Sequence, residues 1–416
     1  MKLKNKIKTV AILGGGPAAG TLATLLARKG IRVAIFYRPN RAPLLVGESL
    51  VPAVIPMLQM LGVEEKVRAF STLKPGATFN IRETDNYSFF FGQITGTVRY
   101  AYNTPRDKFD DAILDAARQS GAKIIEAAAS VEQIGDTDKV KLSADTLAAV
   151  ENFFSGQPDL IVDATGRARL LPNLLKIPSE EGRRKDTALF AHVDRIHLDH
   201  EGHVHSTRLD HGWSWRIPLP GKVSVGMVIG TEFLPQFGAT KEERFDNLLK
   251  QDSMLAKVAK DSKRLTPVME YSNYQLVSKR MVGENWALVG DTAGFIDPVF
   301  SSGLFIGMLG ATILTEAIEK NTPEAFRDYE KEIMHHLKTW HEITDYFYNG
   351  RLFTFFRAGE MLRDNWFIKL SMPHISKHLG RIFSGAASTS RYSLALLRFG
   401  MKHGLRGEDP KVMAIR

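Results

Sequence analysis

The first residues that could do chemistry are the glycines of a turn near the N-terminus. Gly14, Gly16 and Ala19 stand in the spacing G-x-G-x-x-G/A within KTVAILGGGPAAGTLATLLARKG. The first position permits a tight turn, the second lets the backbone approach a pyrophosphate, and the third keeps helix and strand close. The helix would begin at Pro17 and Ala18, and the free N–H groups of its first turn, from Ala18 onward, attract phosphate. The pattern predicts a dinucleotide site.

Two acidic residues lie where predicted strands end farther along the chain. Asp163 closes the apolar run of PDLIVDATGRAR, just before Gly166, and Asp291 follows Gly290 in ENWALVGDTAG. A carboxylate at a strand's C-terminal end can bind the hydroxyls of a ribose or ribityl chain. Together with the glycine turn at Gly14, these make three strand-end loops between residue 14 and residue 291. This number of loops is more typical of a flavoprotein than of a nicotinamide enzyme.

The end of the second predicted strand departs from the usual pattern. An acidic residue is expected there to bind the ribose of NAD, but this chain has Tyr37 followed by Arg38. The difference disfavours NAD. It leaves the adenosine contacts of FAD open, with Arg38 as a candidate.

The segment LVGESLVP offers a further polar loop. Glu48 and Ser49 precede Pro52, which is placed to begin a helix. The two side chains either lie beside the cofactor or cap that helix. We take them as candidate cofactor residues.

The segment FIDPVFSSGLF could bind an anion. Ser301, Ser302 and Gly303 come directly before a predicted helix that begins near Leu304. The first N–H groups of a helix have no partner within it, and they carry the positive end of its dipole. An anion is therefore expected at the backbone of Ser302 and Gly303.

The stretch DHGWSWRIPLPG contains two of the five tryptophans, Trp213 and Trp215. Side chains at positions i and i+2 of a strand point to the same face of its sheet, so the two rings should lie side by side. They are either core residues of a sheet or the wall of a compartment, and both descriptions can hold together.

Histidines form the one cluster that could suggest a metal. Six of the twelve lie in a short segment: His192, His197, His200, His203, His205 and His211. His203 and His205 would share one strand face, a spacing that metals use. No other motif calls for a metal and histidines are common on hairpins, so we predict no metal site.

Composition limits the remaining possibilities. The 416 residues can form a large core and two interlocked domains. The chain has no cysteine, which excludes disulfides, thiolate metal sites and a cysteine nucleophile. Its net charge of +9 favours anionic cofactors or acidic partners without requiring nucleic acid.

The two ends of the chain carry most of the remaining signals. The apolar run after MKLKNKIK is too short for a signal peptide, and we find no apolar run of about 18 residues. We therefore predict a cytoplasmic protein without a transmembrane segment. After Pro373, basic residues outnumber acidic ones. They form either a solvated helical face or a docking surface for an acidic protein or a membrane.

Taken together, the three glycine-containing loops resemble those of FAD-binding monooxygenases of the aromatic hydroxylase type. Arg106 in TPRDKFDDAIL matches a helix-start arginine that this fold places near the flavin. Finer motifs are similar to those of flavin-dependent halogenases. W-x-W-x-I-P, F-x-x-P-x-x-S-x-G and K-x-G-x-x-F are matched by Trp213, Trp215, Ile217 and Pro218, by Phe295, Pro298, Ser301 and Gly303, and by Lys74, Gly76 and Phe79.

The resemblance implies a particular α/β architecture. It predicts a Rossmann-like FAD domain at about residues 1–75, 106–185 and 275–345, interleaved with a mixed substrate sheet at about 76–105 and 186–274. Together these form a halogenase core over residues 1–345. Residues 346–416 would form C-terminal helices near the substrate entrance, where Phe353, Phe355 and Phe356 are candidates to flank an aromatic substrate.

The resemblance also implies a reaction. Reduced FAD (FADH2) would react with O2 to a C4a-hydroperoxide, and a halide would attack it to give hypohalous acid. Lys74 would be the catalytic residue that relays hypohalous acid to the substrate, although the sequence alone fits a surface lysine before a Pro-Gly turn. Trp213, Trp215, Phe295, Pro298 and Ser301 would form the compartment.

The segments GESLVP and DPVFSSGL are most similar to those of halogenases that act on carrier-protein-tethered pyrroles and on phenols. That branch implies a separate flavin reductase as a partner, and an acyl or peptidyl carrier protein where the substrate is tethered rather than free. The alternatives are a hydroxylase that uses NAD(P)H, a flavin reductase of prenyl lipids, and a flavin-binding docking protein. Chloride and bromide are both open as the halide.

Overall fold

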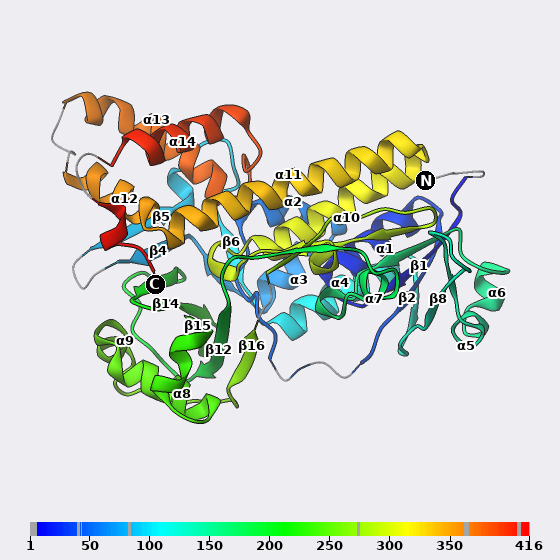
Figure 1. The fold of residues 1–416 in the computed structure, drawn as a ribbon, viewed down its shortest axis with the longest axis horizontal. Coiled ribbons are helices and arrows are strands. Elements are labelled where there is room, and N and C mark those ends of the chain that lie inside the picture. Colours follow the sequence, from blue (N-terminus) through cyan, green and yellow to red (C-terminus); the bar gives the residue numbers. More distant parts are fainter. Residues whose placement is uncertain are drawn as a thin grey trace.

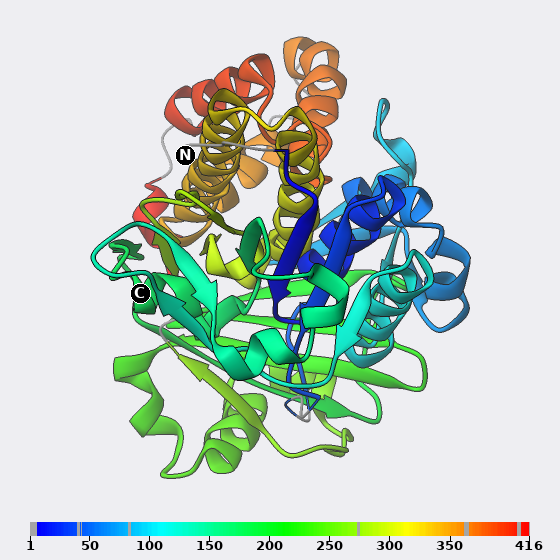
Figure 2. The same ribbon diagram turned by 90° about the vertical axis from the view of Figure 1, so that its right-hand side faces the viewer.

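The structure is a computed structural model that describes residues 6–39, 42, 44–81, 85–272, 275–361, 366–405 and 409–415. Two large sheets lie beside each other, and a group of helices closes one end of the molecule (Figure 1). The view in Figure 2 shows the long helices of residues 302–348 standing above the strands of both sheets. The functional site depends on how these three parts meet.

The first sheet has five parallel strands in the order β18–β10–β1–β2–β7. Its central strands are apolar and fully buried, because a parallel sheet is covered on both faces. The strands are β1 (Thr9–Leu13), β2 (Arg32–Phe36), β7 (Lys123–Ile125), β10 (Leu160–Asp163) and β18 (Trp286–Leu288). Their main covering helices are α1 (Pro17–Arg28), α4 (Arg106–Gln119) and α10 (Ser302–Lys320).

The second sheet has seven strands in the order β16–β12–β15–β14–β13–β4–β5. Only the pair β13 and β4 is parallel, so this is a mixed sheet. Its strands are β4 (Gly76–Asn80), β5 (Asn86–Phe90), β12 (Asp186–Val193), β13 (Val204–Leu209), β14 (Gly212–Leu219), β15 (Lys222–Gly230) and β16 (Met269–Ser272). Helices α8 (Lys241–Gln251) and α9 (Ser253–Ala259) cover its outer face through an apolar cluster that includes Phe245.

Short elements connect these layers. The small strands are β3 (Thr72–Lys74), β6 (Ala101–Asn103), β8 (Val131–Gln133), β9 (Val140–Leu142), β11 (Ser179–Glu181), β17 (Leu276–Ser278) and β19 (Gly294–Phe295). The short helices are α2 (Ile55–Leu61), α3 (Glu64–Ala69), α5 (Ala144–Ala148), α6 (Glu151–Phe154) and α7 (Leu170–Leu174). The 3-10 turns η5 (Gly290–Thr292) and η6 (Pro298–Phe300) lie directly before α10 in the chain.

The C-terminal helices pack at the end of the molecule that contains β4 and β5 (Figure 1). They are α11 (Pro323–Tyr348), α12 (Arg351–Met361), α13 (Trp366–Phe383) and α14 (Arg391–His403). Aromatic rings join them to the mixed sheet, since the ring of Phe356 lies 5.5 Å from that of Tyr87 and 5.3 Å from that of Phe89. This aromatic layer packs the edge of the mixed sheet against the C-terminal helices.

Helix α10 is long and apolar enough to cross a membrane by length and composition alone. In the described structure 61% of its apolar window is buried, and it packs between α1 and α11. A core helix of a large α/β domain has the same composition. We therefore interpret α10 as a core helix.

The predicted α/β fold class is confirmed, with a parallel Rossmann-like sheet, a mixed sheet and C-terminal helices. The mixed sheet takes its strands from residues 76–90 and 186–272, and strands β7 and β10 of the parallel sheet lie between these two segments in the chain. The division of the chain into domains remains a prediction. For the site, the consequence is that the carboxyl ends of β1, β10 and β18 lie toward the inner face of the mixed sheet.

Candidate functional site

A cavity of about 370 Å³ lies between the parallel sheet and the mixed sheet. The loops that follow β1, β10 and β18 form one side of it, and strands β13 and β14 form the other. Segments 45–49 and 298–304 and the start of α4 complete the lining. The lining residues that were predicted from the sequence are Gly14, Gly16, Pro17, Ala18, Glu48, Ser49, Arg106, Gly166, Trp213, Trp215, Gly290, Asp291, Phe295, Pro298, Ser301 and Gly303.

The glycine turn after β1 is shaped for close approach. Gly14 has φ +107°, and a Cβ there would lie 2.3 Å from the carbonyl oxygen of Ala164, so no side chain fits. Helix α1 begins at Pro17 with Gly16 as an N-cap that makes no side-chain hydrogen bond. The first N–H groups of this helix therefore lie at the cavity edge, ready for a phosphate. Ala19 is buried inside α1, where it packs in the core and does not line the cavity.

Asp163 supports a loop behind the cavity. Its carboxylate accepts hydrogen bonds from the Thr165 backbone N–H at 2.8 Å, the Thr165 hydroxyl at 2.7 Å and the Leu171 N–H at 2.7 Å. It is fully buried, and burial raises its pKa. The cavity is lined instead by Ala164, Thr165 and Gly166. The structure thus gives Asp163 a supporting position, where the sequence suggested direct contact with the cofactor.

Arg38 also lies away from the cavity lining. It follows β2 and is exposed. An exposed guanidinium beyond a strand end can reach only the outer part of a bound dinucleotide. The structure therefore supplies no contact that would support the predicted role of Arg38.

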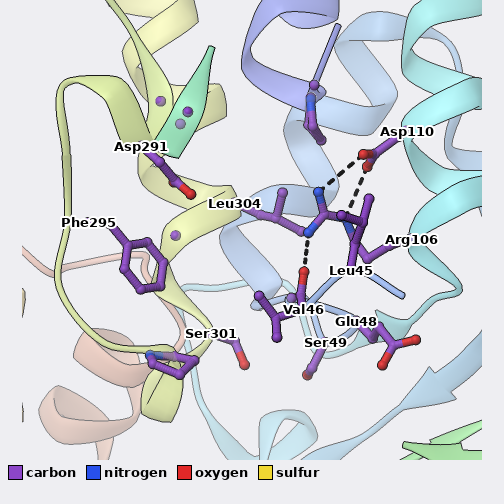
Figure 3. Close-up of a pocket in the computed structure, with 18 of the residues that line it drawn as sticks. Leu45, Val46, Glu48, Ser49, Arg106, Asp110, Asp291, Phe295, Ser301 and Leu304 are labelled. Atoms are coloured by element: carbon purple, nitrogen blue, oxygen red, sulfur yellow. Dashed lines mark hydrogen bonds and ion pairs between the residues drawn. The ribbon is translucent and has the colours of Figure 1, made fainter. Parts of the chain in front are cut away.

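Arg106 lies at the start of α4 and lines the cavity, as Figure 3 shows, with 14% of its side-chain surface exposed. Its guanidinium donates to both carboxylate oxygens of Asp110, at 3.0 and 3.2 Å, and to the carbonyl oxygen of Val46. Gly47 is next to it, and a Cβ there would lie 2.8 Å from the guanidinium. Arg106 thus holds the loop 45–49 against α4. The i, i+4 spacing of Arg and Asp at a helix start could have predicted Asp110.

Two carboxyl groups face the cavity, and that of Glu48 is buried. Asp291 points into it from the loop after β18 (Figure 3), and burial raises its pKa to about 6 although Arg106 and Arg167 oppose that shift. Glu48 lines the opposite side, and its Oε1 lies 2.8 Å from Nε2 of buried His192. The other ring nitrogen of His192 has no hydrogen-bond partner. No motif in the sequence indicates that β12 lies against the loop 45–49.

Lys74 is buried, with 3% of its surface exposed, at the end of β3. Its Nζ donates to Ser49 Oγ at 2.8 Å and to the Leu50 carbonyl oxygen at 2.9 Å, and it lies 5.5 Å from the ring centre of Phe91. Both acceptors are neutral, and burial lowers the pKa of Lys74 to about 7. Ser49 also lines the cavity, so it stands between the cavity and the amine.

Trp213 and Trp215 lie side by side on β14 and both line the cavity. Their ring centres are 5.6 Å apart, in agreement with the predicted shared face. Trp213 Nε1 donates to the Tyr348 hydroxyl at 2.9 Å, and Trp215 Nε1 to Ser224 Oγ at 3.3 Å. The two indoles therefore have fixed positions, which is what a wall requires.

We call residues 298–303 the anion loop. Pro298 begins the turn η6, and Ser301 adopts the left-handed conformation with φ +56° before α10 begins. Gly303 lies against Phe295, because a Cβ at Gly303 would be 3.0 Å from the phenyl ring. Ser302 is buried and contributes no surface to the cavity, unlike Ser301 and Gly303. The glycine and the aromatic residue of the motif are therefore in direct contact.

The histidine cluster has no metal geometry in the described part of the chain, where no group of three or more His, Cys, Asp or Glu could hold an ion. His203 Nδ1 contacts Thr78 at 3.0 Å, and His205 Nδ1 contacts Asn80 at 3.4 Å. Burial lowers their pKa values to about 4 and about 3. Both rings are thus neutral core residues beside β4.

The C-terminal phenylalanines lie in the aromatic layer outside the cavity lining. Phe353 and Phe356 are buried, and Phe356 lies 6.3 Å from Phe79, the last residue of the lysine motif. Phe355 packs on α14, where a Cβ at Gly400 would be 2.9 Å from its ring. Of these three phenylalanines, Phe356 is the one whose ring packs against rings of β4 and β5.

The glycine turn on a parallel sheet, the polar loop 45–49 and the wall of a second sheet define a flavoprotein of the FAD-binding monooxygenase type. The profile of the tryptophan halogenase family matches residues 9–98 and 93–356. The chain belongs to this family, and it is therefore an enzyme of the flavin-dependent halogenase class.

The chain is similar to several known proteins. A 1H-pyrrole-2-carbonyl-[peptidyl-carrier protein] chlorinase of Pseudomonas fluorescens is 29% identical over 385 residues, which cover 83% of this chain and 85% of the relative. A flavoprotein/dehydrogenase from Cytophaga hutchinsonii has a TM-score of 0.81 at 21% identity, over 95% and 97% of the two chains. A variant of halogenase PltM in complex with FAD has a TM-score of 0.71 at 18% identity, over 94% and 88%. These two structures share the fold.

Proposed function

We propose that this enzyme uses reduced FAD, O2 and chloride or bromide to halogenate an electron-rich aromatic ring, either a pyrrole on a carrier protein or a phenol. The observation that carries the proposal is the position of Lys74. It is a buried amine with two neutral acceptors, one of which is the side chain of a residue that lines the cavity. Such an environment keeps the amine available as a nucleophile near neutral pH.

The residues of the cavity fit FAD. Gly16 lines the cavity, and a Cβ there would meet no protein atom within 4 Å, so the backbone at the start of α1 is open to a bound group. The N-terminus of α1 would bind the pyrophosphate through backbone N–H groups. Asp291 would contact hydroxyls of the ribityl chain, and Arg106 would hold the loop 45–49 beside the ring system. Bound reduced FAD would supply oxygen activated from O2, which oxidises halide to hypohalous acid.

The anion loop would bind the halide. In α10 the N–H groups of Ser302 and Gly303 are among the first of a 19-residue helix, so they have no partner within that helix. The positive end of the helix dipole adds attraction for an anion. Trp213 and Trp215 would keep the aromatic substrate away from the cofactor, because their rings line the cavity opposite the glycine turn.

Lys74 would transfer the halogen. Its neutral amine attacks the halogen of hypohalous acid, an N–halogen bond forms, the O–halogen bond breaks, and one amine proton leaves with the oxygen as water. The aromatic carbon then takes the halogen, and the electron pair of the N–halogen bond returns to nitrogen. The ring loses a proton to restore aromaticity. Ser49 would orient the amine through its hydrogen bond at 2.8 Å.

Two partners and a compartment belong to the same proposal. A separate flavin reductase would supply reduced FAD in the cytoplasm. A carrier protein would present the pyrrole, as in the reaction that names the chlorinase of Pseudomonas fluorescens. Carrier proteins are often acidic, and the helices α13 and α14 offer exposed basic side chains at Lys377, Arg391 and Lys402.

The test supplies the enzyme with chemically reduced FAD, O2 and bromide. A trapping reagent measures hypobromous acid, and a pyrrole or phenol reports ring bromination. The wild type should form both products. With the trapping reagent in excess, so that free hypobromous acid is consumed before it reaches the ring, Lys74→Ala should still yield trapped oxidant while ring bromination falls about 1,000-fold. Ring bromination by Lys74→Ala at the wild-type rate would remove Lys74 from the mechanism. Direct consumption of NADPH with hydroxylation and no halogen transfer would instead identify a hydroxylase.

A further inference from the structure

The most informative group outside the mechanism above is Asp297, the residue before the anion loop. It is 2% exposed, and its Oδ1 accepts a hydrogen bond from the Val299 N–H at 2.9 Å. This bond makes Asp297 the side-chain cap of the turn η6, from which the loop continues to Ser301 and α10. The carboxyl group therefore determines the conformation in which the anion loop begins.

The same carboxyl group is connected to the tryptophan wall. Trp213 Nε1 donates to the hydroxyl of Tyr348 at 2.9 Å, and that hydroxyl donates to Asp297 Oδ2 at 2.9 Å. Gln275 Nε2 donates to Oδ2 as well, at 3.3 Å. A continuous chain of hydrogen bonds thus joins one wall of the cavity to the loop on its other side.

The charges around Asp297 place its ionisation near neutral pH. Burial raises its pKa to about 7, and the negative charge of Asp186 adds to that shift, whereas the bonds from Val299, Tyr348 and Gln275 oppose it. Arg184 binds both oxygens of Asp186, and its guanidinium lies 4.1 Å from the ring centre of Tyr348. Three ionisable groups therefore face Asp297: Asp186, Arg184 and Tyr348.

We propose that Asp297 is a positioning residue that joins the tryptophan wall to the anion loop and, by binding or releasing a proton, sets how strongly that loop holds a halide. The inference rests on the proposed halide site. A carboxylate under the loop repels a halide, and a neutral carboxylic acid does not. The halide affinity of the enzyme is therefore highest when Asp297 carries a proton.

The test measures bromide binding by calorimetry on the enzyme loaded with oxidised FAD, so that no turnover occurs. For the wild type we expect the dissociation constant to rise about tenfold between about pH 6 and about pH 8. Asp291 and Lys74 also titrate near this range. Asp297→Asn separates their effects from that of Asp297, because residue 297 then has no charge at any pH. Across this pH range the variant should bind bromide with the affinity that the wild type has at low pH.

Two further variants should move the midpoint of this transition in opposite directions. Tyr348→Phe removes a donor that favours the ionised carboxylate, so the midpoint should rise. Asp186→Asn removes a negative charge, so the midpoint should fall. A residue that only supported the fold would change affinity equally at every pH. Infrared difference spectra should show the carboxylic acid band of Asp297 disappearing with the same midpoint.

The outcomes separate this inference from the proposed function. Bromide binding that does not change with pH, or that changes equally in the wild type and in Asp297→Asn, contradicts the role of Asp297 while the halogenase function stands. No bromide binding at any pH contradicts the halide site and the inference together. A pH-dependent affinity that is lost in Asp297→Asn and shifts in both other variants supports the inference.

Discussion

Two cations, the partly exposed Arg106 and the buried Lys74, lie beside the same loop, and their surroundings differ. Arg106 is matched by Asp110, whose two carboxylate oxygens accept its hydrogen bonds, and it fixes the backbone at Val46. Lys74 reaches the same loop at Ser49 and Leu50, where both acceptors are neutral. One cation has a counterion, and the other has only dipoles.

The difference separates a structural cation from a reactive one. A guanidinium with a bidentate carboxylate stays charged and holds geometry. A buried ammonium without a carboxylate loses its proton readily, which is why burial lowers the pKa of Lys74 to about 7. The loop 45–49 is therefore anchored by Arg106 on one side, and on the other it contacts Lys74, the amine for which we propose the nucleophilic role.

The largest expected effect concerns the stability cost of Lys74. Its pKa in the folded state is below the 10.5 of a free lysine, so the charged form is the disfavoured one. The cost is complete below about pH 7 and disappears as the pH rises to about 10.5, because the unfolded chain then holds the extra proton. Lys74→Met removes it, and should raise the free energy of unfolding at pH 6 by up to about 5 kcal/mol.

Urea unfolding of the wild type and of Lys74→Met across this pH range measures that difference. Arg28→Met serves as the control, because Arg28 lies on α1 and donates to the carbonyls of Met60 and Leu61 outside the site. A gap between wild type and Lys74→Met that stayed constant with pH would mean that Lys74 is not destabilised by its charge.

The next effect removes the counterion of the other cation. Asp110→Ala leaves the guanidinium of Arg106 without a carboxylate, which should cost about 3 kcal/mol of unfolding free energy. The affinity for FAD should fall as well, since the loop 45–49 loses its anchor. Denaturant unfolding and FAD fluorescence titration measure the two effects. Equal stability of Asp110→Ala and wild type would contradict the structural role of this pair.

A third variant gives Lys74 the counterion that it lacks. Ser49→Asp places a carboxylate next to the amine, so the pKa of Lys74 should rise and the fraction of neutral amine at pH 7 should fall about 100-fold. Ring bromination should decrease by a similar factor while FAD stays bound. Ser49→Asn is the matched control of equal size, and it should retain most of the activity. Equal losses in both variants would show that size matters and charge does not.

The smallest effect tests the anion loop. Gly303→Ala introduces a Cβ at 3.0 Å from the Phe295 ring, and a ring shift of a few tenths of an ångström is enough to accommodate it. We expect a loss of about 1 kcal/mol in stability and a bromide dissociation constant raised about threefold. Steady-state rates at several bromide concentrations measure the change. An unchanged bromide dependence would mean that Phe295 and Gly303 do not shape the halide site.

Local spacing made part of this site predictable. The glycine turn, the tryptophan pair and the lysine motif each need only a few neighbouring residues, and all three contribute to one region of the structure. Asp163 shows the limit of such patterns. It ends a strand as predicted, but the N–H groups of Thr165 and Leu171 take its oxygens away from the cavity.

Pairings between distant segments could not be predicted in this way. Glu48 and His192 are 144 residues apart, and Tyr348 and Asp297 are 51 apart. Each contact depends on the register of the mixed sheet or on the angle of α11, which a single sequence does not specify. Asp110 is the exception, since the i, i+4 rule could have revealed it from the residue Arg106.

The proposed chemistry requires that a large fraction of Lys74 is neutral near pH 7, and among the described residues no carboxylate is paired with its ammonium group. NMR spectroscopy of the enzyme with isotopically labelled lysine ammonium groups measures its pKa directly, and Lys74→Met identifies the signal. We predict a single titration near pH 7, and a rise of that value in Ser49→Asp. A Lys74 signal that titrates near 10.5, the value of a free lysine, would contradict the account.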